Sequence, residues 1–457
     1  MKTNRTPPRK QPTQSLLMGL FTVLALLAMA STGLGQQMMA GPQTSPIDEA
    51  TKAEIIDSVL AGIDQIYVFP DKARQMVEHV RTEHKSGAYD DITDLATLTG
   101  QLTEDLRSIC HDLHLTVRTA RPEELTSTDE NREELQRLWE ERSRVNNYAF
   151  HKVERMVGNI GYLELRGFQD ASMAGETAVA AMKFLGNTDA LIIDLRQNGG
   201  GSPSMIQLLC SYFFDEPTHL NSFYIRQEDT IKQFWSLSFV DGRRMTHQPI
   251  YVLTSDYTFS AAEEFTYNLK NLERAMIIGE TTGGGAHPIQ SELYASLGVR
   301  LNVPFGRAIN PITGTNWEGT GVTPHIECPA DDALTIARIQ ALDTLSKMIE
   351  EPMRRYQINW ALDGLKAQRE MVDLSTEELA EYTGEYGPRR IWLEDDHLKY
   401  QRGEGAVMTL IPMGGDSFML SEIDFFRIDF ERNDDGDVIR LHGRYDQGHQ
   451  DAHDRTS

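Results

Sequence analysis

The chain has 457 residues, of which 40% are apolar and 25% are charged, and its formal net charge is −24 at pH 7. This length is sufficient for two or three domains with a large core. A chain this acidic lacks the basic surface that nucleic acids and anionic membranes require, so we expect no nucleic-acid partner.

Residues 1–35 have the pattern of an export signal. Lys2, Arg5, Arg9 and Lys10 form a basic start, and the apolar run that follows from residue 16 to residue 30 is too short for a comfortable membrane span. We therefore expect a periplasmic or extracellular protein with no stable membrane insertion after signal removal. An uncleaved anchor is the alternative.

Residues 48–120 predict an N-terminal helical domain. Two stripes of apolar residues recur there at helical spacing. Their members are Ile55, Ile56, Val59, Leu60 and Ile63, and then Leu95, Leu98, Leu102, Leu106 and Ile109. The polar residues 121–147 have helical composition but little periodicity, so we interpret them as a connecting segment.

Residues 148–345 predict an α/β core. The expected elements are strand 160–165, helix 173–185, strand 190–195, helix 203–213, strand 249–254, helix 261–272 and strand 275–279. This alternation predicts a mostly parallel sheet with its functional residues at the carboxyl ends of the strands. Cys110, Cys210 and Cys328 are too few and too widely spaced for a disulfide framework, so we expect free thiols.

The last part of the chain predicts two further units. Residues 346–374 form a helical linker, and residues 375–457 show short alternating strands separated by Gly and Asp turns. We expect a small C-terminal β-domain, of barrel or sandwich type, and find no candidate catalytic residues in it.

Ser260 stands between the strand 249–254 and the helix that begins at Ala261. A serine in this position can be a nucleophile, because the free N–H groups and positive dipole end of the helix stabilise a neighbouring oxyanion. The stretch Ser260-Ala-Ala-Glu263 also fits a capping box, in which the serine only caps its helix. Taken alone, the motif favours the cap.

The turn Asn198-Gly-Gly-Gly201 follows a buried strand. It does not have the spacing of a phosphate-binding loop. Its glycines, Gly199 and Gly200 in particular, would let backbone amides approach a reacting carbonyl closely, as an oxyanion hole requires. The alternative is an ordinary tight turn.

His114 and Glu318 are the candidates for a general base and for the carboxylate that orients it. His111 and His287 compete with His114 for the role of base. Each of these residues alone would more often be structural. No spacing typical of metal ligands occurs, so we expect no metal and no cofactor.

Taken together, these residues resemble the family of carboxyl-terminal processing (tail-specific) peptidases, which also includes the tricorn core protease and the interphotoreceptor retinoid-binding protein modules. The resemblance covers about residues 50–345. Four segments carry it in the family's order: 194–201 (DLRQNGGG), 258–265 (TFSAAEEF), 279–285 (GETTGGG) and 317–322 (WEGTGV). Tyr67-Val-Phe-Pro70 resembles a part of the family's N-terminal domain.

The resemblance implies a crotonase/ClpP-like core with Ser260 as nucleophile. The amide of Ala261 and one amide of the Gly199–Gly200 turn would form the oxyanion hole. No lysine occupies the slot close to Gly285 that Ser–Lys members use. The resemblance therefore implies the tricorn-like arrangement, with His114 as base and Glu318 as its partner.

Two features depart from the family pattern. Leu113 stands where the tricorn-like members have a serine that assists the relay, and no peptide-binding PDZ domain fits between residues 120 and 148. We predict an exported serine endopeptidase that acts on peptides or proteins through an acyl-enzyme. A non-catalytic module for lipophilic ligands and a small-substrate esterase or amidase are the alternatives, and the oligomeric state stays open.

Overall fold

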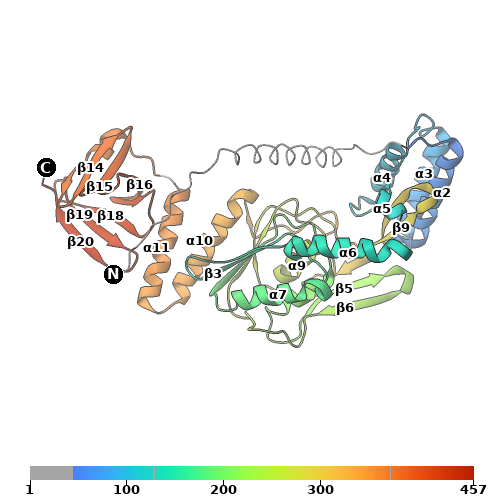
Figure 1. Ribbon diagram of the computed structural model, residues 1–457, viewed down its shortest axis with the longest axis horizontal. Helices are drawn as coiled ribbons and strands as arrows, with labels where there is room; N and C mark the ends of the chain where they lie inside the picture. Colours follow the sequence, from blue (N-terminus) through green and yellow to red (C-terminus); the bar gives the residue numbers. More distant parts are fainter. Residues whose placement is uncertain (1–44, 127–128, 371, 457) are drawn as a thin grey trace, which may run out of the picture.

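The computed structural model describes residues 45–126, 129–370 and 372–456, so the predicted export signal lies outside the described residues. Figure 1 shows three regions along the long axis of the molecule: an N-terminal region at one end, an α/β core in the middle and a C-terminal β-region at the other end. The predicted fold class, an α/β core with an N-terminal helical region and a small C-terminal β-domain, is confirmed.

A six-stranded sheet forms the centre of the core, in the order β12-β8-β7-β4-β3-β2. The strands are β2 (Phe150–Met156), β3 (Ile160–Leu165), β4 (Ala190–Asp194), β7 (Ile250–Thr254), β8 (Met276–Gly279) and β12 (Ile326–Glu327). Only β2 runs antiparallel to its neighbour among these pairs. The mostly parallel sheet is confirmed, and the carboxyl ends of β4, β7 and β8 share one edge.

Helices cover both faces of this sheet. They are α7 (Ala171–Leu185), α8 (Pro203–Cys210), α9 (Ala261–Asn271), α10 (Ala330–Met348) and α11 (Pro352–Arg369). Successive strand side chains point to opposite faces, so Ile193 packs with α7, α8 and α9 whereas Ile192 packs with α10 and α11. Because both faces are covered, β4 and β7 are buried along their whole lengths.

Three helices form most of the N-terminal region: α2 (Glu49–Ile66), α3 (Pro70–Ser86) and α4 (Leu95–Cys110). Strands also contribute, since β1 (Thr116–Thr119) pairs with β10 (Val299–Pro304), which pairs with β9 (Ile289–Tyr294). Val299, Leu301 and Val303 of β10 belong to the core of the helical region. A hairpin from the α/β part of the sequence thus anchors the N-terminal region beside the core.

A third sheet and two connecting helices complete this part of the molecule. The sheet has the order β11 (Gly306–Ile309), β5 (His219–Ile225) and β6 (Thr230–Trp235). Residues of the predicted connecting segment form α5 (Pro122–Leu125) and α6 (Asp129–Val145), with a short 3-10 turn at Asn147–Ala149. The β5–β6 hairpin reaches the N-terminal region, where Arg226 Nη1 donates to the Tyr67 carbonyl at 2.6 Å.

The C-terminal region is an antiparallel meander that follows α12 (Thr376–Ala380). Its strands are β13 (Gly384–Tyr386), β14 (Arg389–Glu394), β15 (His397–Arg402), β16 (Met408–Gly414), β17 (Ser417–Leu420), β18 (Phe426–Arg432), β19 (Val438–Tyr445) and β20 (Gln450–Asp454). The end of the chain returns to the first strand, because the Thr456 N–H donates to the Glu385 carbonyl at 2.9 Å. This contact closes the meander into a barrel-like sheet.

Two smaller predictions concern the cysteines and the membrane. Cys110, Cys210 and Cys328 are all free thiols, as expected, and Cys210 is the buried one of the three. Among the described helices, none combines the length and the apolarity needed to cross a membrane.

Candidate active site

Ser260 lies in the turn between β7 and α9, at the carboxyl edge of the central sheet. Its backbone angles are φ 56° and ψ −121°. A residue with a β-carbon rarely adopts this conformation, which costs about 1–3 kcal/mol. An ordinary N-cap has extended backbone angles, so capping alone does not explain the geometry. Strained strand-to-helix turns of this kind expose a nucleophilic side chain.

Glu263, in the first turn of α9, is fully buried and accepts four hydrogen bonds. Its Oε2 accepts the N–H groups of Ser260 and Gly285, both at 2.8 Å. Its Oε1 accepts the Gly284 N–H at 2.7 Å and the Thr282 hydroxyl at 2.5 Å. Burial raises the pKa of this carboxyl, whereas the four donors favour its ionised form. The carboxylate therefore ties the Ser260 turn to the glycine-rich segment after β8.

The glycine turn after β4 lies directly against Ser260. Gly200 has φ 112°, and a β-carbon on it would lie 2.8 Å from the Ser260 β-carbon, so only glycine fits. Its own N–H donates to Asn198 Oδ1 at 2.9 Å. By contrast, no acceptor within the described residues contacts the N–H of Gly199 or of Ala261. Both amides are therefore free to donate to a group bound beside Ser260.

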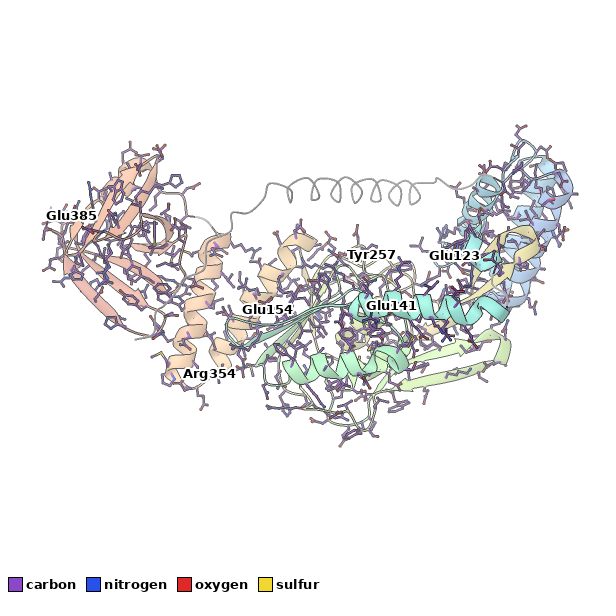
Figure 2. The ribbon with its side chains drawn as sticks, viewed as in Figure 1. Glu123, Glu141, Glu154, Tyr257, Arg354 and Glu385 are labelled. Atoms are coloured by element: carbon purple, nitrogen blue, oxygen red, sulfur yellow. The ribbon has the colours of Figure 1, made fainter. Side chains whose placement is uncertain are left out.

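Hydrogen bonds hold the two turns together. The Thr258 hydroxyl donates to the Leu195 carbonyl at 2.9 Å, and the Ser255 hydroxyl donates to the Arg196 carbonyl at 2.6 Å. Tyr257, labelled in Figure 2, is an exposed aromatic side chain on the same turn. Its ring lies against Gly199, since a β-carbon there would be 3.4 Å from the Tyr257 hydroxyl. The glycine turn is thus fixed relative to Ser260.

His114 reaches this edge from the loop that follows α4. His111 ends that helix in the left-handed conformation, and the His114 N–H donates to Asp112 Oδ1 at 3.0 Å. The His114 ring packs on Phe259, the residue before Ser260, with 4.7 Å between ring centroids. Its Nδ1 is buried and has no hydrogen-bond partner among the described residues. Burial lowers the pKa of His114 to about 4, so the imidazole is neutral at pH 7.

Glu318 is placed by two glycine-rich segments that pack backbone against backbone. The Gly319 N–H donates to the Gly284 carbonyl at 2.9 Å, and a β-carbon on Gly321 would lie 2.1 Å from the Thr282 carbonyl oxygen. The buried Trp317 also donates its indole N–H to the Gly285 carbonyl at 2.8 Å. These contacts fix the Glu318 backbone beside the segment that Glu263 holds.

The Glu318 carboxyl has few partners for a group so deeply placed. Its Oε2 accepts the Ala286 N–H at 2.6 Å, and its Oε1 is buried without a hydrogen bond to any described residue. Burial raises the pKa of Glu318 to about 7, and the charge of His287 opposes that rise. Burial therefore favours the protonated form of this carboxyl more than in an exposed glutamate.

The side chains of Asp112, His114 and Glu318 converge, with ligand-type atoms all within 4.8 Å of one another. His287 joins them, because its Nδ1 lies 2.6 Å from Asp112 Oδ2 and 3.5 Å from Glu318 Oε2. Each imidazole faces a carboxylate, as in a proton-transfer site.

The structure brings together most of the residues singled out from the sequence. The turn that holds Ser260 and Ala261 contacts the turn that holds Gly199 and Gly200. His114 and Glu318 belong to one group of converging side chains. His287 belongs to that group as well, whereas His111 is exposed. Two features were missed: the bond between Asp112 and His287, and the three bonds that Glu263 accepts from Thr282, Gly284 and Gly285. Asp112 lies two residues before His114, but its partner is 175 residues away.

Comparisons with known proteins bear on these residues. Residues 159–328 match the model of peptidase family S41, and residues 49–152 match the N-terminal domain of peptidase S41 in eukaryotic IRBP. The chain belongs to peptidase family S41. The first match contains Ser260, Glu318, His287 and the glycine turns, and the second contains Asp112 and His114.

Curated relatives of this chain include two chloroplastic proteins of Arabidopsis thaliana. Carboxyl-terminal-processing peptidase 2 is 33% identical over 174 residues, which are 37% of this chain and 32% of that protein. Carboxyl-terminal-processing peptidase 3 is 27% identical over 199 residues, 42% of this chain and 37% of that protein. The chain thus spans about a third of the length of these relatives.

Solved structures with a partial likeness include two peptidases. A putative peptidase from Parabacteroides merdae has a TM-score of 0.43 and 17% identity, and the match covers 61% of this chain and 90% of that one. The tricorn protease has a TM-score of 0.39 and 14% identity, with 69% and 37% covered.

Proposed function

We propose that this chain is a serine peptidase that cleaves peptide bonds through an acyl-enzyme on Ser260. The observation that carries the proposal is a convergence at one sheet edge. A strained serine turn meets a histidine loop from the N-terminal region and a glutamate loop from the end of the core. Membership of the S41 family and the names of the relatives support the same activity.

In the proposed reaction, His114 is the general base. Its neutral imidazole takes the proton of the Ser260 hydroxyl as the oxygen attacks the substrate carbonyl, and it then gives that proton to the leaving amine. Ionised Glu318 orients the imidazole and stabilises the imidazolium. The amides of Gly199 and Ala261 donate to the oxyanion. Gly200 has no side chain, so the glycine turn can lie close to Ser260. Water then hydrolyses the acyl-enzyme.

We propose peptides or proteins as substrates, and export to the periplasm or cell exterior as the location. The basic start and apolar run of residues 1–35 support export. Leu113 and Tyr257 are both exposed beside the proposed site, so a bound peptide would contact apolar side chains there.

Peptide hydrolysis tests the proposal. Full-length protein is incubated with a mixed peptide library at pH 8, and the products are identified by mass spectrometry. We expect cleavage by the wild type, its loss in Ser260→Ala, and normal cleavage by Ser238→Ala, which changes an exposed serine on another surface loop. Cleavage that survives Ser260→Ala would refute Ser260 as nucleophile.

The match to the N-terminal domain described for eukaryotic IRBP favours one second candidate, a module that binds lipophilic ligands. A pocket of about 760 Å³ lies between α10, α11, the β2–β3 turn and the C-terminal barrel, and its lining mixes apolar side chains such as Trp360 with charged ones such as Arg354 and Arg427. Retinoid or fatty-acid binding that survives Ser260→Ala, with no hydrolysis by the wild type, would favour this candidate. A panel of small esters and amides separates the peptidase from an esterase or amidase.

A further inference from the structure

A second histidine–carboxylate pair lies beside Glu318. His287 and Asp112 are both almost fully buried, and His287 Nδ1 lies 2.6 Å from Asp112 Oδ2. The same nitrogen is 3.5 Å from Glu318 Oε2. An ionised carboxylate only accepts hydrogen bonds, so Nδ1 carries a hydrogen that it donates to Asp112, and Glu318 Oε2 lies within ion-pair distance of this N–H. The ring therefore presents its positive end to Glu318.

Other contacts fix the His287 ring and its surroundings. Phe69 packs edge-on against it, with 5.5 Å between ring centroids. The titratable and charged groups around the pair and Glu318 come from several elements. They are Tyr67 after α2, Cys110 at the end of α4, His114 and Arg107 near the same loop, and Glu263 of α9.

Glu318 needs such a neighbour if it is to act as an anion. It receives one N–H, from Ala286, and its other oxygen has no partner among the described residues. A buried carboxyl with so few donors tends to take up a proton. A protonated carboxyl would not stabilise the His114 imidazolium. Of the surrounding charges, His287 lowers the Glu318 pKa, whereas Asp112 and Glu263 raise it.

We propose that His287 is a positioning residue that keeps Glu318 ionised and directed at His114, and that Asp112 acts through His287 by holding the hydrogen on its Nδ1. The inference rests on the proposed function and deepens it. It also assigns His287, a competing candidate for the base, to a different task. The relay then runs from Asp112 through His287 and Glu318 to His114.

The pH dependence of kcat/KM tests this relay. Without the His287 N–H beside it, Glu318 holds its proton to higher pH. We therefore expect His287→Leu to shift the acid limb upward by about one pH unit, which is a loss of about tenfold near pH 7. The loss should disappear at pH 9, with KM unchanged. His287→Gln, which keeps an N–H donor, should recover part of the loss.

Asp112→Asn tests the second half of the relay. The side-chain amide introduced by this substitution would donate to Nδ1 and move the hydrogen to Nε2, so a lone pair would face Glu318. The acid limb should again move upward, though less than in His287→Leu, because the negative charge of Asp112 is also lost. His111→Asn is the matched control, since His111 is exposed and asparagine tolerates its left-handed backbone. Profiles of His287→Leu and Asp112→Asn that superimpose on the wild type would overturn the inference.

A spectroscopic measurement separates this inference from the proposed activity. In protein labelled with ¹⁵N-histidine and carrying Ser260→Ala, we expect a downfield Nδ1–H resonance for His287 that is lost in Asp112→Asn. An unprotonated Nδ1 would refute the relay even if peptides are cleaved. If the resonance is present but the wild type cleaves nothing, the proposed function fails while the hydrogen-bonded pair stands.

Discussion

Two glutamates, the fully buried Glu263 and the partly buried Glu318, contact the glycine-rich segment 282–286, and their surroundings differ. Glu263 accepts four hydrogen bonds, from Ser260, Thr282, Gly284 and Gly285. Glu318 accepts one, from Ala286, and its other oxygen has no partner among the described residues. A ring nitrogen of His114 lies within 4.8 Å of one of its oxygens. We call these surroundings the Glu263 cluster and the Glu318 cluster.

The difference indicates a division of labour. Buried polar groups are nearly always hydrogen-bonded, so an unpartnered carboxyl oxygen calls for an explanation. Perturbed and incompletely satisfied titratable groups concentrate at functional sites. The Glu263 cluster holds the backbone that frames Ser260. In the Glu318 cluster, the carboxyl keeps an oxygen that can interact with the His114 imidazolium during a reaction.

The largest effect is expected in the Glu318 cluster, from His114→Ala. Loss of the general base should lower kcat for peptide cleavage by about 10⁵-fold or more, because the serine keeps its proton. The two kcat values are measured from the peptide cleaved after short incubations with the wild type and after overnight incubation with the variant. The control His111→Asn should keep the wild-type kcat. A wild-type kcat in His114→Ala would show that another residue is the general base.

Glu318→Gln should nearly match that loss while leaving the fold intact. An uncharged amide cannot stabilise the imidazolium, so kcat should fall by about 10⁴-fold. The new N–H₂ group can donate to His114 Nδ1, so the free energy of unfolding should stay within about 1 kcal/mol of the wild type. Urea denaturation and peptide assays on the same sample measure both quantities. A large loss of stability would contradict the proposed division.

Glu263→Gln should show the opposite behaviour. In the wild type, N–H donors point at both carboxylate oxygens of Glu263. In the variant, the side-chain N–H₂ group would replace one of these oxygens and face donors with no acceptor, which should lower the free energy of unfolding by about 3 kcal/mol. Urea denaturation at pH 7 measures it, with Glu318→Gln as the matched control. An unchanged midpoint in Glu263→Gln would erase the contrast between the two clusters.

The smallest effect concerns pH. Glu318 has a raised pKa of about 7, so its ionised, working form grows as pH increases through that value. His114, with a pKa of about 4, is already neutral there. We therefore expect kcat/KM to rise with pH up to about 8, by at most tenfold per unit. An acid limb of kcat/KM near pH 4 would mean that the ionisation of His114, and not that of Glu318, sets the pH dependence.

Much of this arrangement could be predicted from local sequence. The buried strands of the core are continuous apolar runs, and the glycines at 200, 284 and 321 mark places where the backbone closely approaches other backbone atoms or Ser260. The alternation of strands and helices predicts that the carboxyl ends of β4 and β7 meet. These signals lie within single elements, so one sequence is enough to find them.

The charge pattern of the site could not be predicted in the same way. The Asp112–His287 bond joins residues 175 apart, and no periodicity connects them. The Gly200 amide was expected to be as available as that of Gly199, but the Asn198 side chain occupies it. The capping box identified the contact between Glu263 and Ser260 but not the three donors from residues 282–285. Each depends on which loops the fold brings together.

The most direct test of the account is the site and rate of labelling by a serine-directed fluorophosphonate. Folded protein is labelled at pH 8, and the modified peptide is located by mass spectrometry. We predict modification at Ser260 alone, slowed at least about a hundredfold in Glu318→Gln and in His114→Ala. Labelling that spares Ser260, or that proceeds equally fast without His114, would contradict the central claim.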